Sequence, residues 1–135
     1  MRRYQLEHAI RTACQIIGRP EVIVVGSQSI LGTFDETRLP ADATMSLEVD
    51  ILPIADDNAE VARLADIIEG VAGEFSPFED LHGFSIDGVD METSAVAAVD
   101  TVTLRATPSW RQFVVSAPSR PVHGIAFGCT GSCRM

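Results

Sequence analysis

Lysine is absent from this chain: all ten of its basic residues are arginines, against nineteen aspartates and glutamates. A chain without lysine cannot carry a P-loop lysine or a Schiff-base lysine, which excludes the enzyme classes that depend on either group. The net charge of −9 argues against a protein that coats nucleic acid or an anionic membrane. No strong affinity for nucleic acid is therefore expected.

Cysteines and long apolar runs are also scarce. Three cysteines in 135 residues do not make a disulfide framework. No apolar run approaches the ~18 residues of a membrane-spanning helix, so no membrane segment is expected. Glu7 and His8 interrupt the apolar region that an export signal beginning at Met1 would need. The sequence therefore predicts a cytoplasmic protein in a reducing environment.

Helix and strand patterns alternate along the chain. Apolar side chains recur at helical spacing over residues 4–18, and again after Asp57, with Glu60 placed as a capping box requires. The buried stripe of this second helix is expected to be Val61, Leu64, Ala65, Ile68, Val71 and Ala72. Strands are predicted over residues 22–25, 47–54 and 84–89, with weaker candidates at 101–105 and 111–115.

This order of elements predicts a single α/β (α+β) domain, with a mixed β-sheet flanked by helices. Residues 1–116 form the predicted domain, and residues 117–135 are expected to be an irregular C-terminal tail. A polar loop is expected over residues 34–46.

Gly26 and Ser27 lie where the first predicted strand passes into a short predicted helix. Glycine permits a tight turn and the close approach of a phosphate, and the serine hydroxyl and free helix amides can donate hydrogen bonds to it. Ordinary strand-to-helix turns also favour glycine and serine, so this dipeptide alone does not define a site.

Glu48 and Asp50 lie two residues apart on the second predicted strand and therefore share a face, with Val49 and Ile51 opposite. Acidic residues are poor strand formers, and two carboxylates held together repel unless a cation lies between them. Mg²⁺ prefers such oxygen ligands. The alternative is a solvated acidic strand face.

Asp87 is the candidate third carboxylate. It belongs to the third predicted strand, on the face opposite Phe84 and Ile86. The dipeptide Asp87–Gly88 is also an ordinary turn signal, so a plain turn is the alternative.

Two further motifs are weaker. VIVVGSQSILG begins like a dinucleotide-binding fingerprint, but Gln28 and Leu31 stand where that pattern needs glycines. His123, Cys129 and Cys133 lack a nearby fourth ligand for zinc.

The stretches VVGSQSILG and SLEVDILP, with weaker echoes in SPFEDLHGFSIDGV and PSWRQFVV, resemble the polymerase-beta-type nucleotidyltransferase superfamily. The chain is similar to its small, uncharacterised bacterial members, some of which are toxin or antitoxin components. The resemblance covers roughly residues 4–115.

The resemblance implies a magnesium-dependent enzyme of the two-metal type, which transfers a nucleoside monophosphate from an NTP to an acceptor hydroxyl on a protein or RNA. By position, Gly26 and Ser27 would hold the triphosphate, and Glu48 and Asp50 would bind Mg²⁺. Asp87 would activate the acceptor or share a second metal ion.

The sequence departs from the superfamily pattern at Glu48, where aspartate is usual, and the chain ends without the further helical segment that such members tend to have. These departures leave an alternative open: a catalytically inactive binding module of the same fold, for example a toxin–antitoxin component with a cognate partner protein.

Overall fold

The computed structural model describes residues 1–34, 36–96, 104–106, 113–115 and 125–128. In chain order the elements are α1 (Arg3–Ile17), β1 (Glu21–Val25), the 3₁₀ helices η1 (Ser27–Gly32), η2 (Glu36–Arg38) and η3 (Ala41–Thr44), β2 (Glu48–Pro53), α2 (Asn58–Ala72), α3 (Pro77–His82), β3 (Ser85–Gly88), α4 (Met91–Val96), β4 (Leu104–Ala106), β5 (Phe113–Val115) and β6 (Ile125–Gly128).

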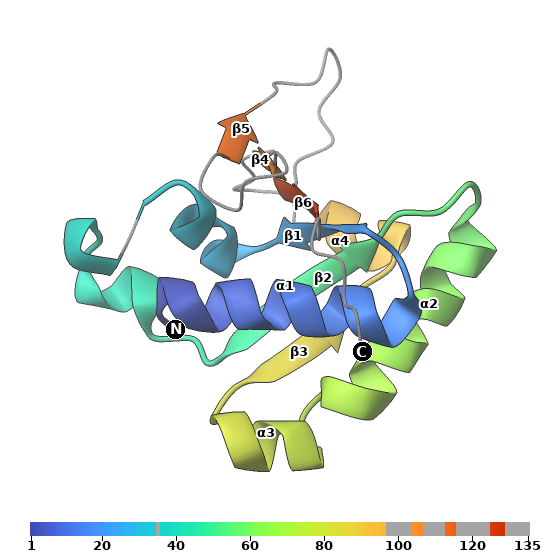
Figure 1. The fold of residues 1–135 in the computed structure, drawn as a ribbon, viewed down its shortest axis with the longest axis horizontal. Coiled ribbons are helices and arrows are strands. Elements are labelled where there is room, and N and C mark those ends of the chain that lie inside the picture. The colour runs from blue at the N-terminus through green and yellow to red at the C-terminus, as the bar shows by residue number, and fades with distance from the viewer. Residues whose placement is uncertain (35, 97–103, 107–112, 116–124, 129–135) are drawn as a thin grey trace, which may run out of the picture.

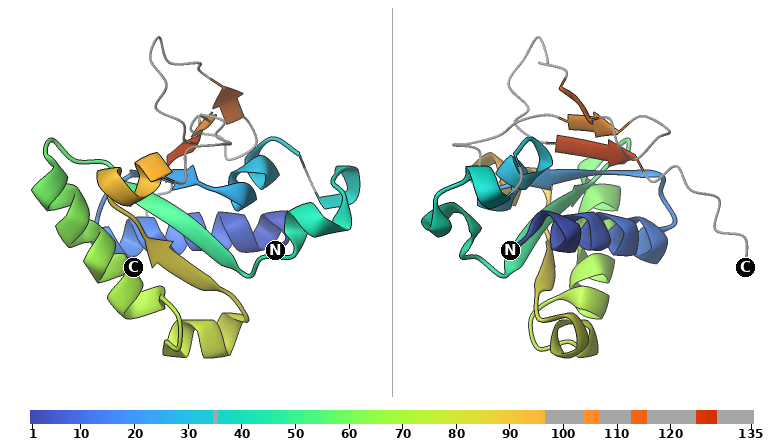
Figure 2. Two further views of the ribbon diagram at one scale, coloured as in Figure 1. Left: turned by 180° about the vertical axis from the view of Figure 1, so that it is seen from behind. Right: turned by 60° about the vertical axis from the view of Figure 1, so that its left-hand side comes forward.

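The main sheet has the strand order β3-β2-β1-β6 and is mixed, as the sequence predicts. β1 pairs antiparallel with both β2 and β6, whereas β2 and β3 are parallel. β4 and β5 form a separate two-stranded ribbon. Figure 1 shows α1 crossing in front of the strands, and in the reverse view of Figure 2 β2 and β3 lie in front of α1. The coarse prediction of a mixed sheet with flanking helices is confirmed.

The main hydrophobic core lies between the sheet and the two long helices. Alternate strand residues and the apolar stripes of α1 and α2 meet there; the members include Leu6, Ile10, Val22, Val24, Val49, Ile51, Ile68, Phe84 and Ile86. A smaller cluster of Val25, Leu52, Val61 and Val89 packs separately. Val25 and Leu52 alternate with the core residues Val24 and Ile51, so they lie on the face of the sheet away from the main core, and Val61 of α2 and Val89 pack with them.

Both long helices begin and end close to the predicted positions. Gly18 ends α1 in the left-handed conformation, with its amide donating to the Cys14 carbonyl. Asp57 caps α2 by accepting a 2.9 Å hydrogen bond from the Glu60 amide. The reciprocal half of the capping box does not form, since the Glu60 carboxylate binds Arg63 instead.

Val71 is a correction to the predicted stripe of α2. Its side chain is 52% exposed, whereas the other five predicted residues are buried. In the C-terminal half of α2 only Ile68 and Ala72 are buried against the rest of the protein, and Val71 lies beside them on the exposed side of the helix.

The chain contains helices that the sequence patterns did not predict. The boundaries of α3 do carry sequence signals. The Ser76 hydroxyl caps the helix by accepting a hydrogen bond from the Glu79 amide, Pro77 is its first residue, and Gly83 follows its last residue. α4 follows β3, and η2 and η3 occupy much of the expected polar loop over 34–46. These elements are short, so their apolar periodicity is too brief to read.

The expected irregular tail over 117–135 differs from the structure at Ile125–Gly128, which forms β6 and pairs with β1. No helix in the described part of the chain is long and apolar enough to cross a membrane.

Candidate functional site

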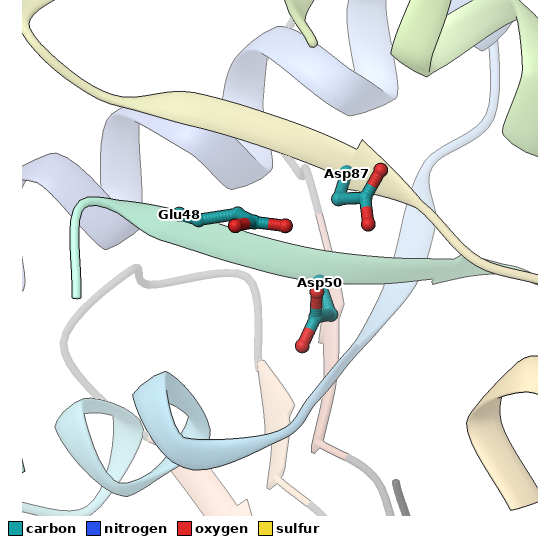
Figure 3. Close-up of side chains that lie close together, drawn as sticks. All are labelled: Glu48, Asp50 and Asp87. Atoms are coloured by element: carbon teal, nitrogen blue, oxygen red, sulfur yellow. The ribbon is translucent and has the colours of Figure 1, made fainter. Parts of the chain in front are cut away.

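Three acidic side chains meet on the face of the sheet opposite the main core. The parallel register of β2 and β3 sets Asp50 beside Asp87 and Glu48 beside Ser85. One carboxylate oxygen from each of Glu48, Asp50 and Asp87 lies within 4.8 Å of the other two. Figure 3 shows Glu48 extending along β2 toward Asp87. We call these three residues the carboxylate cluster.

Strand alternation explains why the cluster forms on this face. Val49 and Ile51 point into the main core and are fully buried, which directs Glu48 and Asp50 the other way. Glu48 is exposed and Asp50 is partly buried. The predicted alternation is therefore confirmed, and the acidic strand face carries a third carboxylate from β3.

The cluster is electrostatically unfavourable without a cation. Burial raises the pKa of Asp50, and the neighbouring Asp87 carboxylate raises it further. Although Glu48 is largely exposed, partial desolvation of its carboxylate raises its pKa as well, with Asp87 and then Asp50 adding to the effect. Each shift means that the negative form is disfavoured, which is the strain that a bound cation relieves.

The donor set fits a hard divalent cation. All three candidate ligands are carboxylates, the type that Mg²⁺ prefers, and no histidine or cysteine belongs to the cluster. Around an octahedral Mg²⁺, adjacent ligand oxygens lie ~3 Å apart and opposite ones ~4.2 Å apart. The three oxygens, which lie within 4.8 Å of one another, would have to move closer together around the ion.

Gly26 joins the turn after β1 to the cluster. Its φ of 75° lies in the region that side-chain-bearing residues rarely adopt. A Cβ atom built on Gly26 would lie 2.5 Å from Oδ2 of Asp50. Glycine is therefore required both by the turn and by the carboxylate packed against it. The sequence predicted the first requirement and missed the second.

Ser27 and Gln28 follow at the start of η1. Ser27 is exposed, whereas Gln28 is buried with its side-chain nitrogen 3.3 Å from Ser27 Oγ. The same nitrogen lies 3.3 Å from the carbonyl oxygen of Ala43 in η3. In the sequence Gln28 served only to argue against dinucleotide binding, and because Ser27 and Ser29 flank it, its burial has no sequence signal.

The Asp87–Gly88 dipeptide lies within β3 and is not a turn. A Cβ atom on Gly88 would overlap the backbone of Ala65, so this glycine lets α2 pack against the end of β3. Asp87 is thus held on a strand with a helix packed behind its end. The plain-turn alternative does not apply.

Cys14 is buried in the main core, where it packs as a small apolar side chain. Trp110, Arg111, His123, Cys129 and Cys133 lie outside the described residues.

His8 and His82, which are far apart in the sequence, come together in space. Their ring centroids are 4.5 Å apart, and His8 stacks on Phe78 at 5.7 Å. Phe84 meets the rings of both Phe78 and His8 edge-on. These rings join α1 to α3, on a different part of the molecule from the carboxylate cluster.

A surface depression just beyond β2 is lined by Arg19, Ile54, Ala55, Asp56, Asp57 and Glu60. None of the carboxylate cluster contributes to it. Its only described cation, Arg19, is paired with Glu60 at 3.5 Å, so the depression offers no free basic group for a phosphate.

No protein-family model, no curated protein and no solved structure matches this chain.

Proposed function

We propose that this protein is a metal-dependent nucleotidyltransferase, which transfers a nucleoside monophosphate from an NTP to an acceptor hydroxyl. The observation that carries the proposal is the carboxylate cluster on two parallel strands, with the Gly26 turn packed against Asp50. Phosphoryl transfer depends on positioning and charge neutralisation, and a divalent cation on carboxylates supplies the latter. The motifs that resemble the nucleotidyltransferase superfamily converge on the same residues.

Each residue has a role in the proposed reaction. Glu48 and Asp50 would hold Mg²⁺, which neutralises charge on the triphosphate oxygens. Ser27 would donate a hydrogen bond from its hydroxyl group to a phosphate oxygen, beside the turn that Gly26 allows. Asp87 would accept the proton of the acceptor hydroxyl, or share a second metal ion. The acceptor oxygen then forms a bond to the α-phosphorus while the α–β phosphoanhydride bond breaks and pyrophosphate leaves.

The overall charge of the chain bears on this proposal. With a net charge of −9 the protein repels a free triphosphate. Nucleotide binding should therefore depend on the divalent cation, and nucleotide without metal should bind weakly if at all.

A thermal-shift titration tests the proposal. Mg²⁺ with one of the four NTPs should raise the melting temperature, since a ligand at 100 times its Kd adds about 2.7 kcal/mol. Asp50→Asn should remove the shift because it takes away a metal ligand. Asp66→Asn, which removes an exposed carboxylate on α2, is the matched control and should keep it. Wild-type protein that shows no shift with any NTP would contradict the proposal.

A second candidate function is a binding module without catalysis, for example a toxin–antitoxin component. Apolar side chains favour it: Phe75 is 88% and Leu81 78% exposed near α3, with Val71 nearby in sequence. This function predicts a cognate partner whose binding survives Glu48→Ala combined with Asp50→Ala. Loss of that binding in a co-purification experiment would count against it.

A further inference from the structure

Gln28 is a buried polar residue next to the proposed phosphate-binding turn. Its side chain is 3% exposed, although Ser27 beside it is exposed to solvent. The terminal amide lies between two segments, with Nε2 at 3.3 Å from both Ser27 Oγ and the Ala43 carbonyl oxygen. Gln28 thus connects the start of η1 to η3, 15 residues further along the chain.

The Ala43 carbonyl fixes which way the Gln28 amide faces. A carbonyl oxygen only accepts hydrogen bonds, so the group that faces it must be the NH₂ end of the amide. The opposite orientation would place two oxygens against each other. The second proton of the same NH₂ group is then directed at Ser27 Oγ.

This contact sets the role of the Ser27 hydroxyl. A hydroxyl has one proton to donate and two lone pairs that accept. Since the Gln28 amide donates to one lone pair of Ser27 Oγ, the hydroxyl group of Ser27 can still donate a hydrogen bond to an oxygen acceptor. Ser27 directly follows Gly26, whose Cα lies against the Asp50 carboxylate. Figure 3 shows Asp50 directed from β2 toward this part of the chain.

The oxygen of the Gln28 side-chain amide indicates that packing is not the reason for a glutamine at this position. Oε1 of Gln28 is buried and has no hydrogen-bond partner among the described residues. A buried acceptor without a partner costs free energy, which an apolar side chain of similar shape would avoid. Glutamine at this position is therefore better explained by what its NH₂ group does.

We propose that Gln28 is a positioning residue that orients the Ser27 hydroxyl as a hydrogen-bond donor to the triphosphate of a metal-bound nucleotide. This inference rests on the function proposed above. Gln28 does not touch the nucleotide or the metal; it acts through Ser27, and it couples the turn to η3.

A double-mutant cycle tests the inference. Affinity for Mg²⁺ with the NTP that shifts wild-type protein most is measured for wild type, Gln28→Met, Ser27→Ala and the double variant. Gln28→Met should weaken nucleotide affinity about 3- to 10-fold, as expected for loss of one oriented hydrogen bond. The double variant should be no weaker than Ser27→Ala, because the effect of Gln28 passes through Ser27.

Binding of Mn²⁺ alone is the readout that a merely structural role would change. It should be the same in wild type and Gln28→Met, since the carboxylate cluster keeps all its ligands. A Gln28→Met affinity equal to wild type, full additivity in the cycle, or a parallel loss of Mn²⁺ binding would overturn the inference while the proposed function stands. If the wild type binds no NTP at all, both fall together.

Discussion

Gly26 shows how one residue can serve the backbone and the site together. Its positive φ is needed where β1 turns into η1, and its missing side chain leaves room for the Asp50 carboxylate. The turn requirement could be predicted from the sequence, because Gly–Ser follows a β-branched run. The contact with Asp50 could not be, because it depends on the pairing of Val25 with Asp50 across 25 positions of the chain.

Two glycines with positive φ allow these effects to be compared. Gly26→Ala should destabilise the fold by about 1–2 kcal/mol from the positive φ and should also displace Asp50, weakening Mg²⁺ binding. Gly18→Ala also places alanine at a positive φ, in the milder left-handed region with φ 64° and ψ 30°, and nothing lies within 4 Å of a Cβ there. It should cost stability of about 1 kcal/mol and leave Mg²⁺ binding intact. Urea unfolding and calorimetric titration would distinguish them, and equal loss of Mg²⁺ binding in both would refute the contact.

At the scale of elements, local signals and long-range pairing differ in what the sequence reveals. The long helices were predictable because fifteen residues each carry a repeated apolar stripe with caps. α3 was missed although Ser76, Pro77 and Gly83 mark its ends, since six residues give too little periodicity. The β2–β3 register, which places Asp50 beside Asp87, depends on how the two strands pair and cannot be predicted from either strand alone.

The contact between α1 and α3 should make stability depend on pH. Burial lowers the pKa of His8, and His82 and Arg11 lower it further. Because the folded-state pKa lies below the unfolded value of about 6.5, the neutral His8 stabilises the fold above that pH. This contribution is lost as pH falls through the lowered pKa. Unfolding free energies measured from pH 7.5 to 5 should therefore decline.

The decline is assigned to His8 by comparison with His8→Phe, which keeps a ring against Phe78 but cannot take up a proton. The wild type should lose more stability than the variant over this range. A comparison is needed because the carboxylate cluster acts in the opposite direction, with raised pKa values that favour the folded state as pH falls. Identical pH profiles of the unfolding free energy for wild type and His8→Phe would show that protonation of His8 does not affect stability.

On the scale of the whole molecule, one face of the sheet packs in the hydrophobic core and the other carries the candidate site. α1 and α2 cover one face and bury the main core, while the other face carries the carboxylate cluster together with Val25 and Leu52 of the smaller apolar cluster. Strand alternation made this division predictable from the sequence. The addition of β6 to the sheet was not predictable, because its pairing with β1 joins residues about 100 positions apart.

The division has a consequence for stability. Three carboxylates held together on a partly open face repel one another, so the site weakens the fold that supports it when no cation is bound. Solvent screening keeps this cost modest. Removing one carboxylate should then stabilise the metal-free protein and at the same time abolish its response to metal, a trade between stability and function.

The most direct test of the account is the unfolding free energy of wild type and Asp50→Asn at pH 7.5, each with EDTA and with excess Mg²⁺. In EDTA the variant should be the more stable by about 0.5–1 kcal/mol, since repulsion is relieved. Mg²⁺ should stabilise the wild type and reverse that order, while leaving Asp50→Asn unchanged. If Mg²⁺ shifts both proteins equally, or neither, the carboxylate cluster is not a metal site and the central claim is wrong.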